Sequence, residues 1–167
     1  EASNAWNLLG RAEMAQDQWQ RAELAFEHAI ELDPTQAILH NNLGLLYVKM
    51  KSAEEAGEAL ETAVELFDGA APHFVFNNLG LAHEMADNPQ EARQAFAEAL
   101  LIKPFYARAK LNLQRVEEKI AQRDAKAPRT ASLVAPEDPE ATPYIETPID
   151  AVVAIEEEET PAEAAIE

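Results

Sequence analysis

A repeat with a period of 34 to 36 residues is the feature that most constrains how this chain can fold. Three Leu-Gly pairs mark the repeat, with the glycines at Gly10, Gly44 and Gly80. In each copy an alanine follows the glycine after twelve and again after nineteen residues, and a large apolar residue follows after sixteen. A period of this length is typical of an array in which one supersecondary unit is stacked so that neighbouring copies share a core.

The residue types at these fixed places predict that each unit is a pair of helices. Glycine and alanine let two helix backbones approach closely, and the large residue at Phe26, Leu60 or Phe96 fills the volume between them. A helix restart with a capping box is expected inside each unit. The predicted boxes are Asp17 with Gln20, Ser52 with Glu55, and Asn88 with Glu91.

The composition favours helices over sheets. Hydrophobic residues make up 47% of the chain, but aromatic residues only 7%, and there are five glycines. Sheets are built mainly from β-branched and aromatic residues, and hairpins need glycine at positive φ. The sequence therefore predicts an all-α fold.

The repeated positions resemble the tetratricopeptide repeat family, whose pattern is an aromatic residue, Leu-Gly, Tyr, Ala, Phe, Ala and Pro. The first unit matches it at Trp6, Leu9, Gly10, Ala22, Phe26, Ala29 and Pro34, and the third unit matches it at the equivalent places. The resemblance implies a right-handed superhelical solenoid of antiparallel helix pairs. Its units would span 3–36, 37–70 and 73–106, followed by a capping helix at 107–123. Departures from the pattern include His40 in the aromatic slot.

Residues 124–167 are expected to form a disordered acidic tail rich in Pro, Ala and Glu. They hold 12 of the 31 acidic residues and only two of the 13 basic ones, a composition that cannot bury enough apolar surface to fold alone. Within the tail Ile149, Val152 and Val153 fall on one face of a short predicted helix. This motif would dock into the array's own groove or onto a separate protein, or the tail would serve only to solubilise the chain.

The resemblance also implies a peptide-binding groove, because the first helix of each unit lines the concave face in tetratricopeptide arrays. The residues expected there are Asn7, Arg11, Ile38, Asn41, Asn42, Leu45, Val48, Phe74, Asn77, Asn78, Leu81, Met85, Arg108, Asn112 and Arg115. Asparagine is a poor helix former, so its recurrence within these helices calls for a reason. The amides would either hold the backbone of a bound peptide or pair with neighbouring turns of the array.

Several function classes are excluded. A net charge of −18 opposes binding to nucleic acid, and no apolar run is long enough to insert into a membrane. The chain has no cysteine, its four histidines lack metal-ligand spacing, and no catalytic motif is recognisable. We therefore expect no enzyme activity, no cofactor and no metal.

Two functional hypotheses follow. The first is a protein-interaction adaptor or scaffold that binds a polypeptide segment in its groove. The alternative is a structural subunit of a multi-protein complex, such as a bacterial pilus or envelope-secretion machine, that contacts partners through its ends or outer face. Localisation is not specified beyond cytoplasm or bacterial periplasm. The chain begins at Glu1 rather than Met, so an upstream signal peptide, lipid anchor or further repeats are compatible with it.

Overall fold

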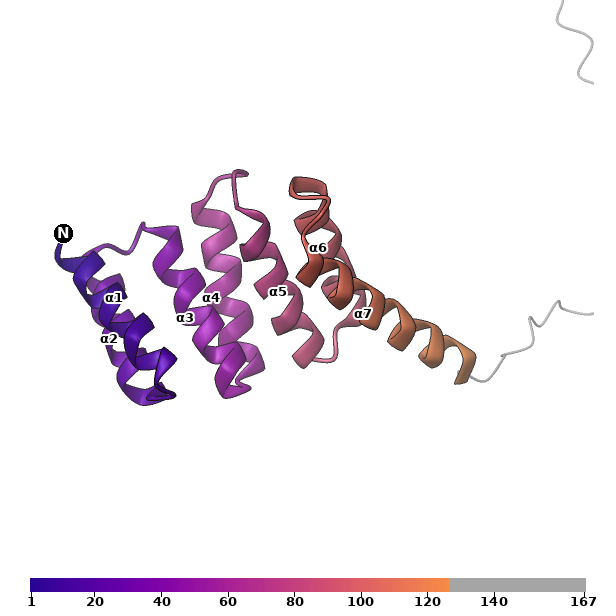
Figure 1. The fold of residues 1–167 in the computed structure, drawn as a ribbon, viewed down its shortest axis with the longest axis horizontal. Helices are drawn as coiled ribbons and strands as arrows, with labels where there is room; N and C mark the ends of the chain where they lie inside the picture. Colours follow the sequence, from indigo (N-terminus) through magenta and orange to yellow (C-terminus); the bar gives the residue numbers. More distant parts are fainter. Residues whose placement is uncertain (127–167) are drawn as a thin grey trace, which may run out of the picture. The chain divides into compact units, whose positions relative to one another are not determined.

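The computed structural model describes residues 1–126, which form seven α-helices (Figure 1). Their bounds are α1 (Ala2–Ala15), α2 (Trp19–Leu32), α3 (Ala37–Met50), α4 (Ala53–Leu66), α5 (His73–Met85), α6 (Pro89–Ile102) and α7 (Ala107–Lys126). This part of the chain contains no strand. The predicted all-α fold and its seven helices are confirmed there.

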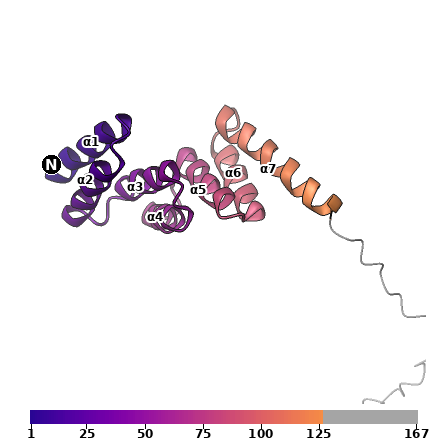
Figure 2. The same ribbon diagram turned by 90° about the horizontal axis from the view of Figure 1, so that it is seen from below.

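The helices stack as a row of antiparallel pairs. The most extensive contacts join α1 to α2, α3 to α4 and α5 to α6, and α7 packs against α6 (Figure 2). Successive members of the set α1, α3, α5 and α7 also touch one another, and we call these the inner helices. We call α2, α4 and α6 the outer helices. The units of the repeat are therefore helix pairs, and α7 occupies the place of a fourth inner helix.

Close packing explains the three repeated glycines. A Cβ atom on Gly10 would lie 2.7 Å from the Phe26 ring. The same atom on Gly44 would lie 2.5 Å from Leu60 Cγ, and on Gly80 it would lie 2.5 Å from the ring of Phe96. These three large side chains are fully buried. Each unit therefore holds its two helices together by the same small-to-large contact, as predicted.

The core continues from unit to unit rather than lying within one pair. Phe26 of the first unit clusters with Leu46 of α3. At the other end of the array, Phe96 clusters with Val116 of α7. The burial of Val116 holds α7 against the array, as expected for a capping helix.

The predicted capping boxes are wrong. The N-cap of α2 is Gln18 rather than Asp17, and neither Ser52 nor Asn88 makes a side-chain cap hydrogen bond at its own helix start. The turns are organised by the end of the preceding helix instead. Backbone N–H groups of each turn donate to the last carbonyls of that helix and close its C-terminal end.

Left-handed residues make this arrangement possible. Asp17, Lys51 and Asp87 have φ values of 58°, 65° and 58°. The N–H of each following residue donates to the carbonyl oxygen five positions back, at 2.9 to 3.0 Å. This is a Schellman motif, which is usually built around glycine. All three units use it with a non-glycine residue.

One boundary differs from the sequence prediction. Helix α7 ends at Lys126, three residues beyond the expected end of the cap. Between α4 and α5, Asp68 and Gly69 both have positive φ, and this turn accommodates the two extra residues of the second repeat. The rest of the predicted tail, including Ile149, Val152 and Val153, lies outside the described residues.

Candidate functional site

The inner helices border a hollow of about 450 Å³. Its lining comes from α1, α3, α5 and the start of α7: Asn7, Arg11, Met14, Ile38, Asn41, Asn42, Leu45, Phe74, Asn78, Tyr106 and Arg108. Nine of these were predicted as groove residues. Met14 lies one helical turn after Arg11, on the face of the first helix that was expected to meet a ligand, whereas Tyr106 was missed. We call this hollow the inner groove.

The remaining predicted groove residues lie outside the hollow. Val48 packs against the core cluster around Leu60, and Leu81 packs against the cluster around Phe96. Met85 is exposed near the end of α5. The other three, Asn77, Asn112 and Arg115, make contacts between α5 and α7. A ligand role for these six residues stays a prediction.

Asparagine side chains join neighbouring inner helices. Three hydrogen bonds run from the Nδ2 of one asparagine to the Oδ1 of another: Asn42 to Asn7 (2.7 Å), Asn78 to Asn41 (3.0 Å) and Asn112 to Asn77 (3.0 Å). We call this series the asparagine ladder. Asn41, Asn77 and Asn78 are buried, and a buried amide without a partner would be costly. The ladder therefore explains why asparagine recurs within these helices.

The ladder does not use every polar atom that faces the inner groove. Within residues 1–126, no hydrogen bond is made by Asn7 Nδ2 or by Asn78 Oδ1. Both side chains line the hollow. The groove thus keeps one amide donor and one amide acceptor that a bound main chain could use. Pairing inside the array and contact with a ligand are compatible at these two residues.

The inner groove carries two cations that are free of carboxylate partners within the described chain, Arg11 and Arg108. Arg115 differs, because it forms a two-pronged pair with Glu84 at 2.8 and 2.6 Å. The hydrogen bond to Glu84 raises the pKa of Arg115. Among the predicted arginines, Arg11 and Arg108 are therefore the two available to a ligand.

The Tyr106 end of the groove is a small aromatic cluster. His73 meets Tyr106 edge to face, with ring centroids 4.6 Å apart, and Lys103 lies 5.8 Å from the centre of the tyrosine ring. Burial lowers the pKa of His73, and the charge of Lys103 lowers it further. The imidazole is therefore biased towards its neutral form beside the groove.

A larger hollow of about 620 Å³ lies on the opposite side, between α2, α3 and α4. Four carboxylates line it, from Glu27, Glu31, Glu55 and Glu58. Burial raises the pKa of Tyr47 in its wall, and a hydrogen bond to Glu23 adds to the rise. We favour the smaller inner groove as the functional site, because it combines free cations, unpaired amide atoms and apolar side chains.

Residues 1–126 offer neither a membrane-spanning helix nor a cluster of metal ligands. No helix there is long and apolar enough to cross a membrane. No group of three or more His, Cys, Asp or Glu residues in that part of the chain is arranged to hold a metal ion.

Several solved structures resemble this fold. The Arabidopsis OM64 TPR domain has a TM-score of 0.66 and 22% identity, over 70% of this chain and 95% of that one. The Sgt2 TPR domain from Aspergillus fumigatus has a TM-score of 0.69 and 20% identity, over 90% of each chain. The second TPR domain of human RPAP3, solved with an HSP70 peptide, has a TM-score of 0.63 and 23% identity, over 69% and 98%.

Two family models match the sequence of this chain. Residues 34–103 match a model described as tetratricopeptide repeat, and residues 10–51 match one described as TPR repeat. Together the matches span more than half of the chain and include all three packing glycines. The chain belongs to the tetratricopeptide repeat family.

Proposed function

We propose that this protein is a non-enzymatic interaction adaptor whose inner groove binds an extended segment of another polypeptide. The observation that carries the proposal is the lining of the groove. Ile38, Leu45 and Phe74 offer apolar contact, while Arg11 and Arg108 offer positive charge. Apolar side chains, two cations and unpaired amide atoms spread over four helices offer contacts to both the side chains and the main chain of a bound polypeptide.

Related domains support a peptide as the ligand. The first TPR of Spaghetti (RPAP3) was solved bound to the HSP90 peptide SRMEEVD, and the second TPR domain of human RPAP3 in complex with the HSP70 peptide SGPTIEEVD. Some tetratricopeptide proteins hold such chaperone tails with a constellation of lysines, an asparagine and an arginine. This chain has Arg11 and Asn42 in comparable places but lacks both lysines, and Asn78 replaces the arginine. We therefore favour an apolar-rich segment that carries one or two carboxylates over a chaperone tail.

Binding can be tested with peptides selected from a random library against the wild-type chain. Fluorescence anisotropy would then compare wild type with Leu45→Glu and with Arg108→Glu. Both variants should weaken binding by roughly tenfold or more, because one places an unpaired charge against apolar side chains and the other reverses a cation.

The matched control is Leu66→Glu, an exposed residue at the end of α4 that does not line the groove. It should bind as wild type does. Equal binding by all four proteins would place the peptide elsewhere and refute the groove proposal. Loss in all three variants would point to unfolding, which circular dichroism on the same samples would detect.

A further inference from the structure

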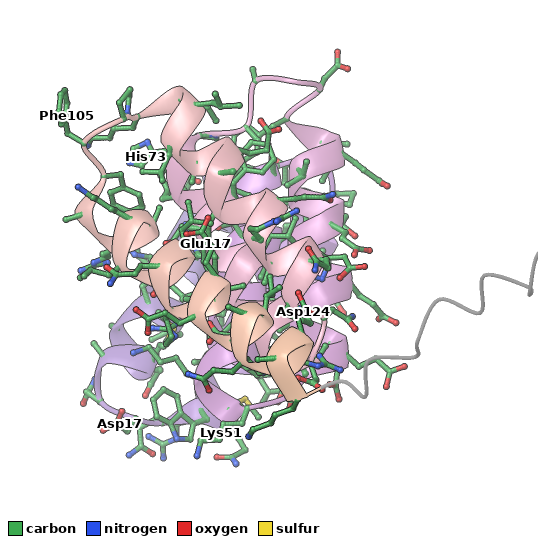
Figure 3. All side chains as sticks on the ribbon, turned by 90° about the vertical axis from the view of Figure 1, so that its right-hand side faces the viewer. Asp17, Lys51, His73, Phe105, Glu117 and Asp124 are labelled. Carbon is green, nitrogen blue, oxygen red and sulfur yellow. The ribbon has the colours of Figure 1, made fainter. Side chains whose placement is uncertain are left out.

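The four inner helices run in the same direction, because an antiparallel outer helix connects each one to the next. Figure 3 shows His73, which begins α5, and Phe105, which lies just before α7, at one edge of the array. Asp17 and Lys51, which follow the ends of α1 and α3, lie at the opposite edge. A position on one inner helix can therefore be compared directly with the equivalent position on the next.

The lining of the inner groove shifts along these helices from each one to the next. On α1 the groove is lined by the second, third and fourth turns, through Asn7, Arg11 and Met14. On α3 the lining residues lie in the first three turns, on α5 in the first two, and on α7 only in the first turn, at Arg108. The groove therefore crosses the helices obliquely, from the C-terminal half of α1 to the start of α7.

The sequence repeat alone indicates a different path across the helices. One slot of the repeat holds a residue from each inner helix in turn: Arg11, Leu45, Leu81 and Arg115. The structure closes the second half of this path, because Leu81 packs against a buried core cluster and Arg115 is paired with Glu84. The cation left for a ligand on α7 is Arg108, about two turns before Arg115.

The oblique groove has a cation at each end and, within residues 1–126, no carboxylate in its lining. Arg11 lies on α1 and Arg108 on α7, and both side chains are exposed. The hollow on the opposite side of the array is instead lined by four carboxylates, and the whole chain has a net charge of −18. The inner groove is thus a cationic path on an anionic molecule, and it complements a ligand with a carboxylate near each end.

The amides between the two arginines are held in one orientation. A continuous series of hydrogen bonds runs from Asn78 to Asn41, from Asn41 to Asn42 at 3.3 Å, and from Asn42 to Asn7. Turning any one amide over would break this series, so the unpaired acceptor stays on Asn78 and the unpaired donor on Asn7. A helical ligand uses its main-chain groups internally, whereas an extended one offers them to such atoms.

We propose that the ligand of the inner groove is an extended internal segment in which two acidic side chains flank an apolar stretch. This inference rests on the proposed function and adds the chemistry and the path of the ligand. One acidic side chain meets Arg11 and the other meets Arg108, while the apolar stretch lies over Ile38, Leu45 and Phe74. Neighbouring helices pack about 8–10 Å apart and an extended chain rises about 3.3 Å per residue, so the two acidic residues are roughly seven to nine positions apart.

The full-length chain tests the proposal with a random peptide library of about twelve residues, which is long enough to span the path. The best-binding sequence is synthesised with both termini blocked, and its affinity is measured by fluorescence anisotropy. Arg11→Gln and Arg108→Gln should each weaken binding by about tenfold, because each removes one charged contact. Arg115→Gln is the matched control, since it neutralises a cation of α7 that lies off the oblique path, and it should bind as the wild type does.

Exchanging charges between peptide and protein identifies each contact. The acidic residues of the selected peptide are changed to Lys one at a time, and each change should weaken binding to the wild type. One Lys peptide should recover about tenfold in affinity with Arg11→Glu, and a different one should recover with Arg108→Glu. The two recoveries should not interchange, because each arginine meets its own acidic residue.

Three results would overturn this inference and leave the groove itself in place. They are a requirement for a free peptide C-terminus, an equal loss with Arg115→Gln, and recovery through only one of the two arginines. In each case Leu45→Glu would still weaken binding, because the peptide would still lie in the groove. Peptides that Leu45→Glu does not affect would instead contradict the proposed function.

Discussion

At the scale of single residues, the repeated glycines are required for space and not for backbone freedom. Gly44 lies within α3, where any residue can adopt the helical conformation, yet its missing side chain leaves room for Leu60. The sequence repeat predicted this packing role, because the glycines and the large residues recur together. The asparagines were harder to interpret, since ladder pairing and ligand binding both require amides on the same helix face.

Replacing Gly44 with Leu should destabilise the array by at least roughly 1–3 kcal/mol, because the core is already filled at that point. Gly57 provides a matched control, since a Cβ atom there has no neighbour within 4 Å. Gly57→Ala should stabilise α4 by about 0.5–1 kcal/mol through its higher helix propensity. Urea unfolding followed by circular dichroism measures both, and an unchanged midpoint for Gly44→Leu would contradict the packing argument.

Changing Asn42 and Asn78 together to Ala should lower stability and leave the helices formed. The ladder acceptors on Asn7 and Asn41 would lose their donors, at about 1–3 kcal/mol for each group that stays buried. Thermal unfolding and peptide affinity should be measured on the same sample. Lower stability with unchanged affinity would show that these amides serve only the ladder. A loss of affinity greater than that of an equally destabilised core variant would show that they contact the ligand.

At the scale of elements, the sequence located every turn but not its hydrogen bonding. The Ser52-x-x-Glu55 pattern predicted where α4 begins, and Ser52 is indeed its N-cap residue. The pattern could not show that Lys51 adopts a left-handed conformation, because lysine carries no preference for it. The backbone N–H groups of Lys51 and Ser52 donate to the last carbonyls of α3, and bonds between main-chain groups leave no residue signature for the sequence to show.

Lys51→Gly should therefore stabilise the protein by up to about 1 kcal/mol. Glycine removes the strain at φ 65°, although its greater freedom in the unfolded chain offsets part of the gain. Lys49→Gly, two residues earlier in the last turn of α3, should instead destabilise the protein by roughly 1 kcal/mol. Differential scanning calorimetry of the pair checks the sign, and destabilisation by both would show that the strain at Lys51 is already relieved.

At the scale of the whole molecule, charge is distributed unevenly along the chain. Residues 127–167 carry ten of the eighteen net negative charges. The array carries the remainder but also presents Arg11 and Arg108 in its inner groove. This sequence feature bears on the proposed function, because a polyanion attached to the array competes with acidic ligands for the same cations.

Truncation after Lys126 removes ten net negative charges and should strengthen the binding of an acidic peptide in the inner groove. The gain should shrink as salt is raised, because exposed charges are screened over about 8 Å at physiological ionic strength. If the Ile149 motif instead occupies the groove, truncation should tighten peptide binding and shift the NMR signals of Leu45, and that effect should persist at high salt because it depends on apolar contact. A variant with Ile149, Val152 and Val153 changed to Ser keeps the charge and removes the motif. If the tail acts only through its charge, this variant should bind peptide as the wild type does. If the motif docks in the groove, the variant should bind peptide more tightly, as the truncated chain does.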